Sequence, residues 1–181
     1  MLLAQLPATP SSARVALWRR MRAAGAASIL NGAWVLPSND VHAGLFGHLI
    51  ETVRGQGGHA TVFTTLSPEG DHTIIERFQA DRAREYAEFQ ERCRAFLEEV
   101  EKERQAEKFT FAELEELEDD YAKLAVWIGK IRARDFFPGA DCEAAKGVLQ
   151  ACHAARDGFA AAVYAREGLG AADAPADPTS S

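Results

Sequence analysis

An Asn-Gly dipeptide at residues 31–32 constrains the fold of this chain more than any other feature. Apolar runs flank it, with Ala26–Leu30 before it and Ala33–Leu36 after it. Asn-Gly between two apolar runs is the strongest short signal of a β-hairpin, because both central residues of the tight turn need a positive φ. Pro37 then stops the second strand. The sequence therefore predicts a hairpin over residues 26–36.

A strand and a helix precede this hairpin. Residues 2–6 read as a short apolar strand. The helix is expected from Ala13 to Ala24, with a serine as its N-cap and Gly25 just past its end. The sequence therefore predicts a strand and then a helix before the hairpin.

A helix and a strand follow the hairpin. The helix is expected from about Asp40 to Arg54. Residues 59–66 alternate in polarity and are rich in β-branched side chains, which indicates a strand. The apolar stripe of this second helix consists of Val41, Leu45, Leu49 and Val53.

The order of elements is therefore β-α-β-β-α-β. Two βαβ units with right-handed crossovers, joined by a hairpin, give an antiparallel four-stranded sheet with both helices on one face. We expect an α+β protein in which residues 1–68 form a ferredoxin-like domain.

From Asp71 on, the pattern becomes helical. Two segments carry apolar side chains at alternating spacings of three and four, which is typical of the seam of an antiparallel helical hairpin. Thr110 and Glu113 form a capping box before the second segment, and a third helix is expected to end near Arg166. We expect three helices packed together over residues 69–166 and a disordered tail at 167–181. The seam residues are Tyr86, Phe89, Cys93, Phe96 and Val100, then Leu114, Leu117, Tyr121, Leu124, Ile128 and Ile131.

Charge is distributed unevenly along the chain. The net charge is −7, yet residues 1–39 contain four arginines and no acidic residue. A guanidinium suits phosphates and oxyanions because its planar fork makes bidentate contacts, so the cluster is a candidate site for DNA phosphate or an oxyanion. The alternative is a solvated helix face that pairs with acidic residues of the helical segment. The candidate residues are Arg14, Arg19, Arg20 and Arg22, of which Arg14 lies nearest the apolar stripe and is expected to be partly packed.

Other kinds of chemistry find little support in the residues. Three cysteines in no CxxC pattern suit structural thiols in a reducing cytosol. The five histidines do not have the spacing of a metal site. The acidic runs of the helical segment look like ordinary solvated helix faces. No apolar run approaches the roughly 18 residues of a membrane span. We expect no metal, no cofactor, no membrane partner and no enzyme activity.

Two separated motifs resemble one known family. Residues 6–37 read LPATPSSARVALWRRMRAAGAASILNGAWVLP and resemble the N-terminal domain of the ChrB chromate-resistance regulators. The family pattern there is a strand ending in LP, then P-S-S-x-R-V-x-x-W-R-R, G-A and a G-x-[WY]-x-L-P strand. Residues 109–137 read FTFAELEELEDDYAKLAVWIGKIRARDFF and resemble the helical part of the same domain. The front half is also similar to the ferredoxin-like domain of PaaX-type repressors and, more distantly, to the small CRISPR adaptation nuclease.

The resemblance implies a role in chromate-responsive regulation. Regulators of this family bind the promoter of a chromate-efflux operon, and basic residues of this domain are implicated. The full family pattern includes a C-terminal chromate-resistance domain that this sequence does not contain, so properties of that part are not carried over. The nuclease relatives use an acidic residue at the end of the first strand, where this chain reads Gln5-Leu6-Pro7, and metal-dependent cleavage is therefore not expected.

We therefore expect a cytoplasmic regulatory or sensor protein that binds promoter DNA, or an oxyanion such as chromate or sulfate, through its basic first helix. The competing hypothesis is a non-catalytic interaction module that acts with a separate chromate-resistance partner, in which the arginines are only structural. Related small ferredoxin-like domains pair through their sheets, so a homodimer is also expected.

Overall fold

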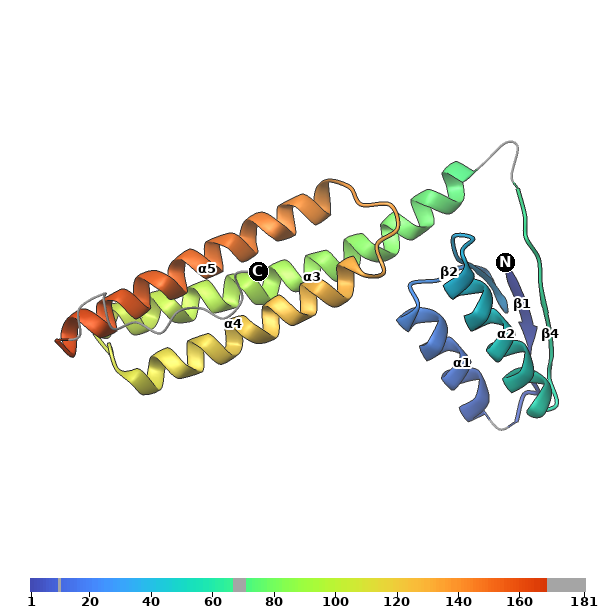
Figure 1. Ribbon diagram of the computed structural model, residues 1–181, viewed down its shortest axis with the longest axis horizontal. Coiled ribbons are helices and arrows are strands. Elements are labelled where there is room, and N and C mark those ends of the chain that lie inside the picture. Colours follow the sequence, from blue (N-terminus) through green and yellow to red (C-terminus); the bar gives the residue numbers. More distant parts are fainter. Residues whose placement is uncertain (10, 67–70, 169–181) are drawn as a thin grey trace. The chain divides into compact units, whose positions relative to one another are not determined.

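The computed structural model describes residues 1–9, 11–66 and 71–168 and divides into two compact units (Figure 1). The sheet unit comprises residues 1–84 and 131–139, and the helical unit comprises residues 85–130 and the chain from 140 on. The predicted α+β class is confirmed. An independently folding domain that ends at residue 68 stays a prediction, and the predicted tail lies outside the described residues from position 169 on.

Over residues 1–66, as far as the structure describes them, four antiparallel strands and two helices follow one another in the predicted succession. The strands are β1 (Leu2–Gln5), β2 (Ala27–Leu30), β3 (Ala33–Val35) and β4 (His59–Val62), and their order in the sheet is β2-β3-β1-β4. Helices α1 (Ser11–Ala23) and α2 (Asp40–Gly55) run side by side (Figure 1). Both helices share one core with the sheet, which includes Leu2, Met21, Trp34, Phe46, Leu49, Val53 and Ala60.

The hairpin is present, but its turn differs from the expected one. Gly32 has a φ of 80°, whereas Asn31 does not take a positive φ. A register shift between Ser28 and Leu30 inserts a β-bulge into the pairing of β2 with β3, so one left-handed residue is enough to close the turn. Gly32 is also required sterically, because a Cβ there would collide with the carbonyl oxygen of Ala4. The Ala4 N–H donates to the Gly32 carbonyl at 2.7 Å, which ties the turn to β1.

Helix α1 begins at Ser11, two residues earlier than expected, and ends at Ala23, one residue before the expected Ala24. Gly25 has a φ of 77°, and its N–H donates to Arg22 while the N–H of Ala26 donates to Met21, at 3.0 and 2.9 Å. This pair of bonds is a Schellman motif, which satisfies carbonyls at the end of the helix.

Helix α2 differs from its expected apolar stripe. Val41 is 79 % exposed, while Phe46 is buried beside Leu49 and Val53. Residues spaced by four drift around a helix of 3.6 residues per turn, so three successive steps of four carry Val41 off the face that Val53 occupies. The expectation for Val41 was therefore wrong, and the spacing 46–49–53 follows the buried face.

The helical unit is built from α3 (Asp71–Gln105), α4 (Phe111–Arg132) and α5 (Ala140–Arg166), of which α3 and α4 begin or end in the sheet unit. Its three helices run side by side (Figure 1). The α3–α4 seam is antiparallel, because Phe89 meets Trp127 at 5.6 Å and Phe96 meets Tyr121 at 6.5 Å between ring centroids. Each predicted seam residue is buried except Tyr121, which is half-buried. The Thr110 hydroxyl accepts the Glu113 N–H at 3.3 Å, as the capping box predicts.

Candidate anion-binding site

The four candidate arginines lie on helix α1, which belongs to the sheet unit. It has no acidic residue in its first turn, and two of the arginines, Arg20 and Arg22, lie in its last turn. Cations there interact favourably with the negative end of the helix, by about 0.3–1 kcal/mol each at exposed positions. Part of the arginine content of α1 therefore serves the helix itself.

The structure separates the four arginines into different surroundings. Arg14 and Arg19 are exposed, and within the described residues no ion pair or hydrogen bond holds either side chain. Arg14 lines an open groove, so the expectation that it would be partly packed was wrong. Arg20 lies on another side of the helix, with Nη1 3.5 Å from the hydroxyl of Thr52 on α2.

Arg22 contacts an acidic residue, as the alternative interpretation of the cluster expects. Its Nη1 lies 3.7 Å from the carboxylate of Asp81 on α3, and its guanidinium lies 5.9 Å from the ring centroid of Trp18. Asp81 is only 5 % exposed and also has Arg77 Nε at 3.9 Å. Both distances exceed those of a hydrogen bond, so two guanidiniums share one buried carboxylate mainly by charge.

These groups line a small pocket of about 270 Å³. Trp18, Arg22, Arg77 and Asp81 border it, together with the polar side chains of Ser28 and Asn31. The pocket holds two guanidinium groups against one carboxylate, so its net charge is +1. Sequence reasoning missed Arg77, although its i,i+4 spacing to Asp81 on a helix was available as a signal.

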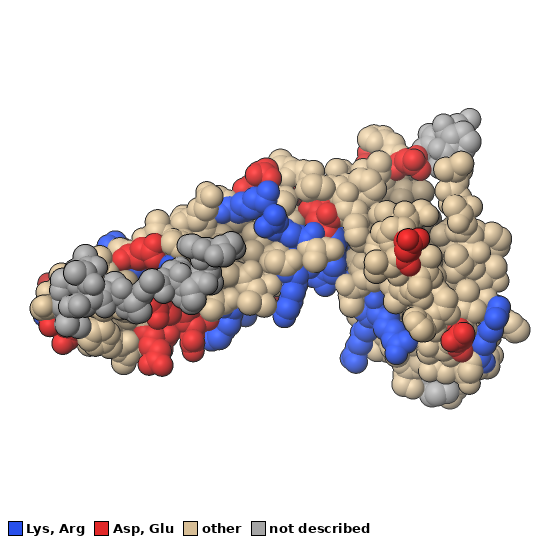
Figure 2. All heavy atoms as spheres, in the orientation of Figure 1, with Lys and Arg blue, Asp and Glu red and all other residues tan. Residues whose placement is uncertain are grey.

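The two units differ in charge. The sheet unit holds ten Lys and Arg against seven Asp and Glu, a net +3, while the helical unit holds ten against twenty, a net −10. Figure 2 shows basic side chains over α1 and acidic side chains over the first half of α4. A polyanion is therefore attracted to the sheet unit and repelled by the helical unit.

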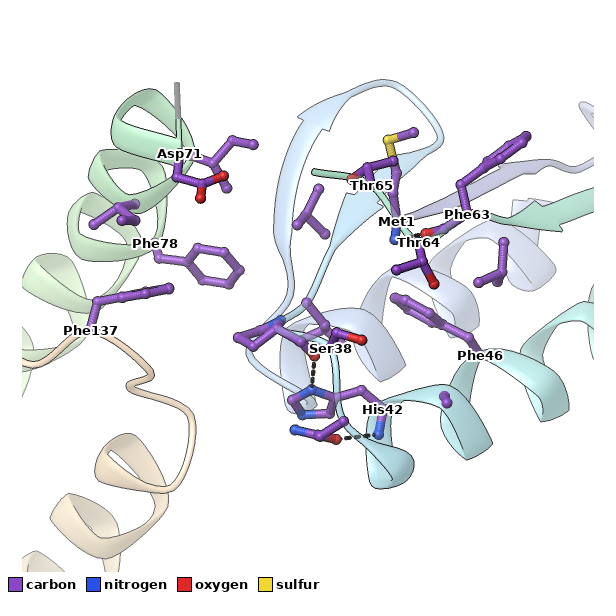
Figure 3. A pocket seen from close by; sticks show the side chains of 18 residues that line it. Met1, Ser38, His42, Phe46, Phe63, Thr64, Thr65, Asp71, Phe78 and Phe137 are labelled. Carbon is purple, nitrogen blue, oxygen red and sulfur yellow. Dashed lines mark hydrogen bonds between the residues drawn. The ribbon is translucent and has the colours of Figure 1, made fainter. Parts of the chain in front are cut away.

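A second cavity, of about 300 Å³, was not predicted from the sequence (Figure 3). Aromatic side chains, among them Phe46, Phe78 and Phe137, form its walls, and Ser38, Thr64 and Thr65 contribute hydroxyls. His42 lies at its border, where Nδ1 is 2.7 Å from the Pro37 carbonyl, and its backbone N–H donates to the Asn39 cap at 2.8 Å. Among the described residues of the lining, Asp71 is the one acidic side chain, and Met1 also borders the cavity.

The cysteines belong to the core of the helical unit. Cys93, Cys142 and Cys152 are free and buried. The Cys152 Sγ lies 3.6 Å from the Cys93 carbonyl oxygen, and the hydrogen bond with Cys152, followed by burial, raises the pKa of the Cys93 thiol. Among the described residues no group of three His, Cys, Asp or Glu side chains could hold a metal ion.

A match to a protein family shows which family the chain belongs to. The family described as "Protein ChrB, N-terminal" matches residues 14–169. The chain belongs to the ChrB N-terminal family. The match begins at Arg14 on α1 and extends past the end of α5, so it covers both units. Membership of the ChrB family suggests involvement in the regulation of chromate resistance.

No curated protein and no solved structure matched the chain. Within the described ranges, none of the helices combines the length and the hydropathy that crossing a bilayer requires.

Proposed function

We propose that this protein is a cytoplasmic, non-catalytic regulator of chromate resistance that binds the phosphate backbone of promoter DNA through α1. Arg19 and Arg14 make the contacts in this proposal, with Arg20 beside them and Arg22 holding the helix in place. We also assign a ferredoxin-like topology to the sheet, which the strand order β2-β3-β1-β4 supports.

The observation that carries the proposal is the exposed charge of Arg14 and Arg19 on α1. Residues 1–39 contain no acidic residue, and the guanidiniums of Arg14 and Arg19 have no partner among the described residues. Exposed arginines of this kind make bidentate contacts to phosphate oxygens without giving up an existing pair. The −10 charge of the helical unit leaves the sheet unit as the surface that DNA can approach.

Fluorescence anisotropy with a labelled duplex from the region upstream of the protein's own gene tests the proposal. The Arg19→Ala/Arg20→Ala variant is expected to bind that duplex at least about tenfold more weakly, because hydrogen bonds to charged groups contribute about 1.5–3 kcal/mol each. The matched control is Arg92→Ala/Arg94→Ala, which removes two exposed arginines from α3 in the acidic unit. Equal losses in both double variants would contradict a site on α1.

A second candidate ligand is a small oxyanion such as chromate or sulfate in the pocket between Arg22 and Arg77. The pocket of about 270 Å³ fits a tetrahedral anion, and its lining places two guanidiniums, those of Arg22 and Arg77, against the one carboxylate of Asp81. An anion in the pocket would lie between the guanidiniums of Arg22 and Arg77. Thermal unfolding in sodium sulfate against sodium chloride at equal ionic strength is expected to show specific stabilisation of the wild type that Arg77→Ala lacks. The same gain in both proteins would contradict this candidate.

We further propose that the regulator acts as a homodimer, which would present two copies of α1 to a palindromic site. Light scattering of the full chain, whose monomer mass is 19.7 kDa, distinguishes the two states. A monomer mass at micromolar concentration would contradict the dimer.

A further inference from the structure

Exposed apolar side chains converge on one groove of the sheet unit. The groove has a volume of about 980 Å³ and lies between α1, the tip of the β2–β3 hairpin and strands β1 and β4. In the described part of the chain ten large apolar side chains are exposed, and half of them line this groove. Single exposed apolar residues are ordinary, but a contiguous group marks an interaction site. The five are Leu3, Val15, Trp18, Leu30 and Phe63, with exposures from 40 % to 72 %.

The hairpin geometry opens the groove. The bulge between Ser28 and Leu30 changes the register at the end of β2, and Leu30 is left 72 % exposed at the hairpin tip. The turn then closes at Gly32, so β3 pairs with β1 only at Leu2 and Leu3. The end of β1 therefore borders the groove where a longer hairpin would have covered it.

The groove is basic as well as apolar. Arg14 lines it, and His59 is the other ionisable side chain in the lining, which contains no Asp or Glu in the part of the chain described. An exposed guanidinium at the side of an apolar surface is complemented by a carboxylate that accompanies apolar side chains. The charge of the groove thus indicates a ligand that carries a carboxylate as well as apolar side chains.

A polypeptide fits these features better than the other macromolecular ligands. Arg19 and Arg20 do not line the groove, so a nucleic acid strand lying in it would meet one guanidinium among mainly apolar side chains. A second copy docked face to face would bring two Arg14 side chains together without an acidic partner.

We propose that this groove is the docking site for an apolar segment of a partner protein that carries a carboxylate to pair with Arg14. Trp18 is the central anchor, because it lies between Arg14 and Arg22 at i,i+4 spacing on one helix face and is 53 % exposed. Tryptophan and arginine are the side chains that dominate binding energy at protein interfaces. This role goes beyond DNA binding, since the docked segment engages Arg14 alone of the proposed phosphate contacts and leaves Arg19 and Arg20 outside the groove.

Selection from a random-peptide library on the full-length chain tests the proposal. The enriched peptides are expected to combine several large apolar residues with Asp or Glu. Fluorescence anisotropy with one enriched peptide is then expected to show about thirtyfold weaker binding for Trp18→Ala, as for a truncated hot spot, and about tenfold for Arg14→Gln. The matched control is Val41→Ser, which removes an exposed apolar side chain of α2 that does not line the groove, and it is expected to bind like the wild type.

Several results would overturn the proposal. They are a failure to enrich any peptide, equal binding by wild type and Trp18→Ala, and displacement of the peptide by single-stranded oligothymidylate. A dimer that dissociates in Leu30→Ser would assign the groove to a second copy and would overturn it too. Thermal unfolding of each variant establishes that it is folded. The DNA affinity of Trp18→Ala, measured separately, distinguishes failure here from failure of the DNA-binding role.

Discussion

Arg22 on α1 holds its guanidinium 3.7 Å from the carboxylate of Asp81 on α3, a side chain that is only 5 % exposed. This pair links the helix that carries the arginine cluster to the first turns of the long helix. Removing Arg22 would leave Asp81 with Arg77 at 3.9 Å as its remaining charged neighbour among the ion pairs described above. The four arginines are therefore not equivalent.

Arg22→Ala is expected to lower the free energy of unfolding by about 1–3 kcal/mol, the cost of weakening the compensation of a buried charge. Arg19→Ala removes an exposed side chain without a partner among the described residues, and it is expected to change the free energy of unfolding by less than about 0.5 kcal/mol. Urea denaturation followed by circular dichroism measures both. Equal effects from the two substitutions would contradict the structural role of Arg22.

Gly32→Ala is expected to destabilise the sheet unit. The left-handed backbone costs an alanine about 1–2 kcal/mol, and the collision with the Ala4 carbonyl adds to that. The matched control is Gly47→Ala on α2, where a Cβ meets no atom within 4 Å and replacing a helical glycine gains about 0.5–1 kcal/mol. Thermal unfolding of the two variants should therefore shift in opposite directions, and a shift in the same direction would disprove the turn geometry.

Glu103 is expected to make the stability of the helical unit depend on pH. It is 3 % exposed, and Lys108 Nζ lies 2.9 Å from its carboxylate, with Lys102 Nζ at 3.5 Å. Its hydrogen bond to Lys108 is the main cause that holds the pKa of Glu103 below its usual 4.5. Because the folded-state pKa is the lower one, this stabilisation is complete above pH 4.5 and disappears as the pH falls through the lowered value.

The midpoint of thermal unfolding, measured from neutral to acidic pH, tests this dependence. Glu103→Gln should unfold at a lower temperature than the wild type near neutral pH, and the difference should shrink as the pH falls below 4.5. A difference that stays constant with pH would show that packing, rather than charge, accounts for the effect of the substitution.

The buried thiols of the helical unit are expected to resist modification. Cys93 and Cys152 have no measurable exposure, and the raised pKa of Cys93 disfavours its reactive thiolate form. Ellman's reagent should therefore label them only after urea unfolds the unit. Rapid labelling of both thiols in the native protein would contradict their burial.

Apolar periodicity predicted the helical unit well because burial there follows the helical repeat. Phe89, Cys93 and Val100 are fully buried, as their spacing indicates. The same approach failed at Val41, since a run of residues spaced by four does not stay on one helix face. The Asn-Gly signal located the hairpin, but the bulge in β2 made a second positive φ unnecessary.

The sequence identified the arginines of the candidate site but not their separate surroundings. The contact between Arg22 and Asp81 joins α1 to α3, which only tertiary packing brings together. The groove around Trp18 likewise depends on where the hairpin ends relative to β1, a matter of register that composition does not contain. Local pattern thus predicts elements and residue types, whereas pairing and pocket shape depend on contacts that are distant in sequence.

The salt dependence of DNA binding tests the central claim most directly. With Arg14, Arg19 and Arg20 as the candidate contacts, three phosphate contacts give a slope of log K against log salt near −2.7, because each contact contributes about −0.9. Arg19→Ala/Arg20→Ala should flatten the slope by about 1.8 while the variant stays folded, with at most a small drop in the midpoint of thermal unfolding from the lost Arg20 contacts. An equal slope for wild type and variant, or no binding by the wild type at low salt, would contradict phosphate recognition by α1.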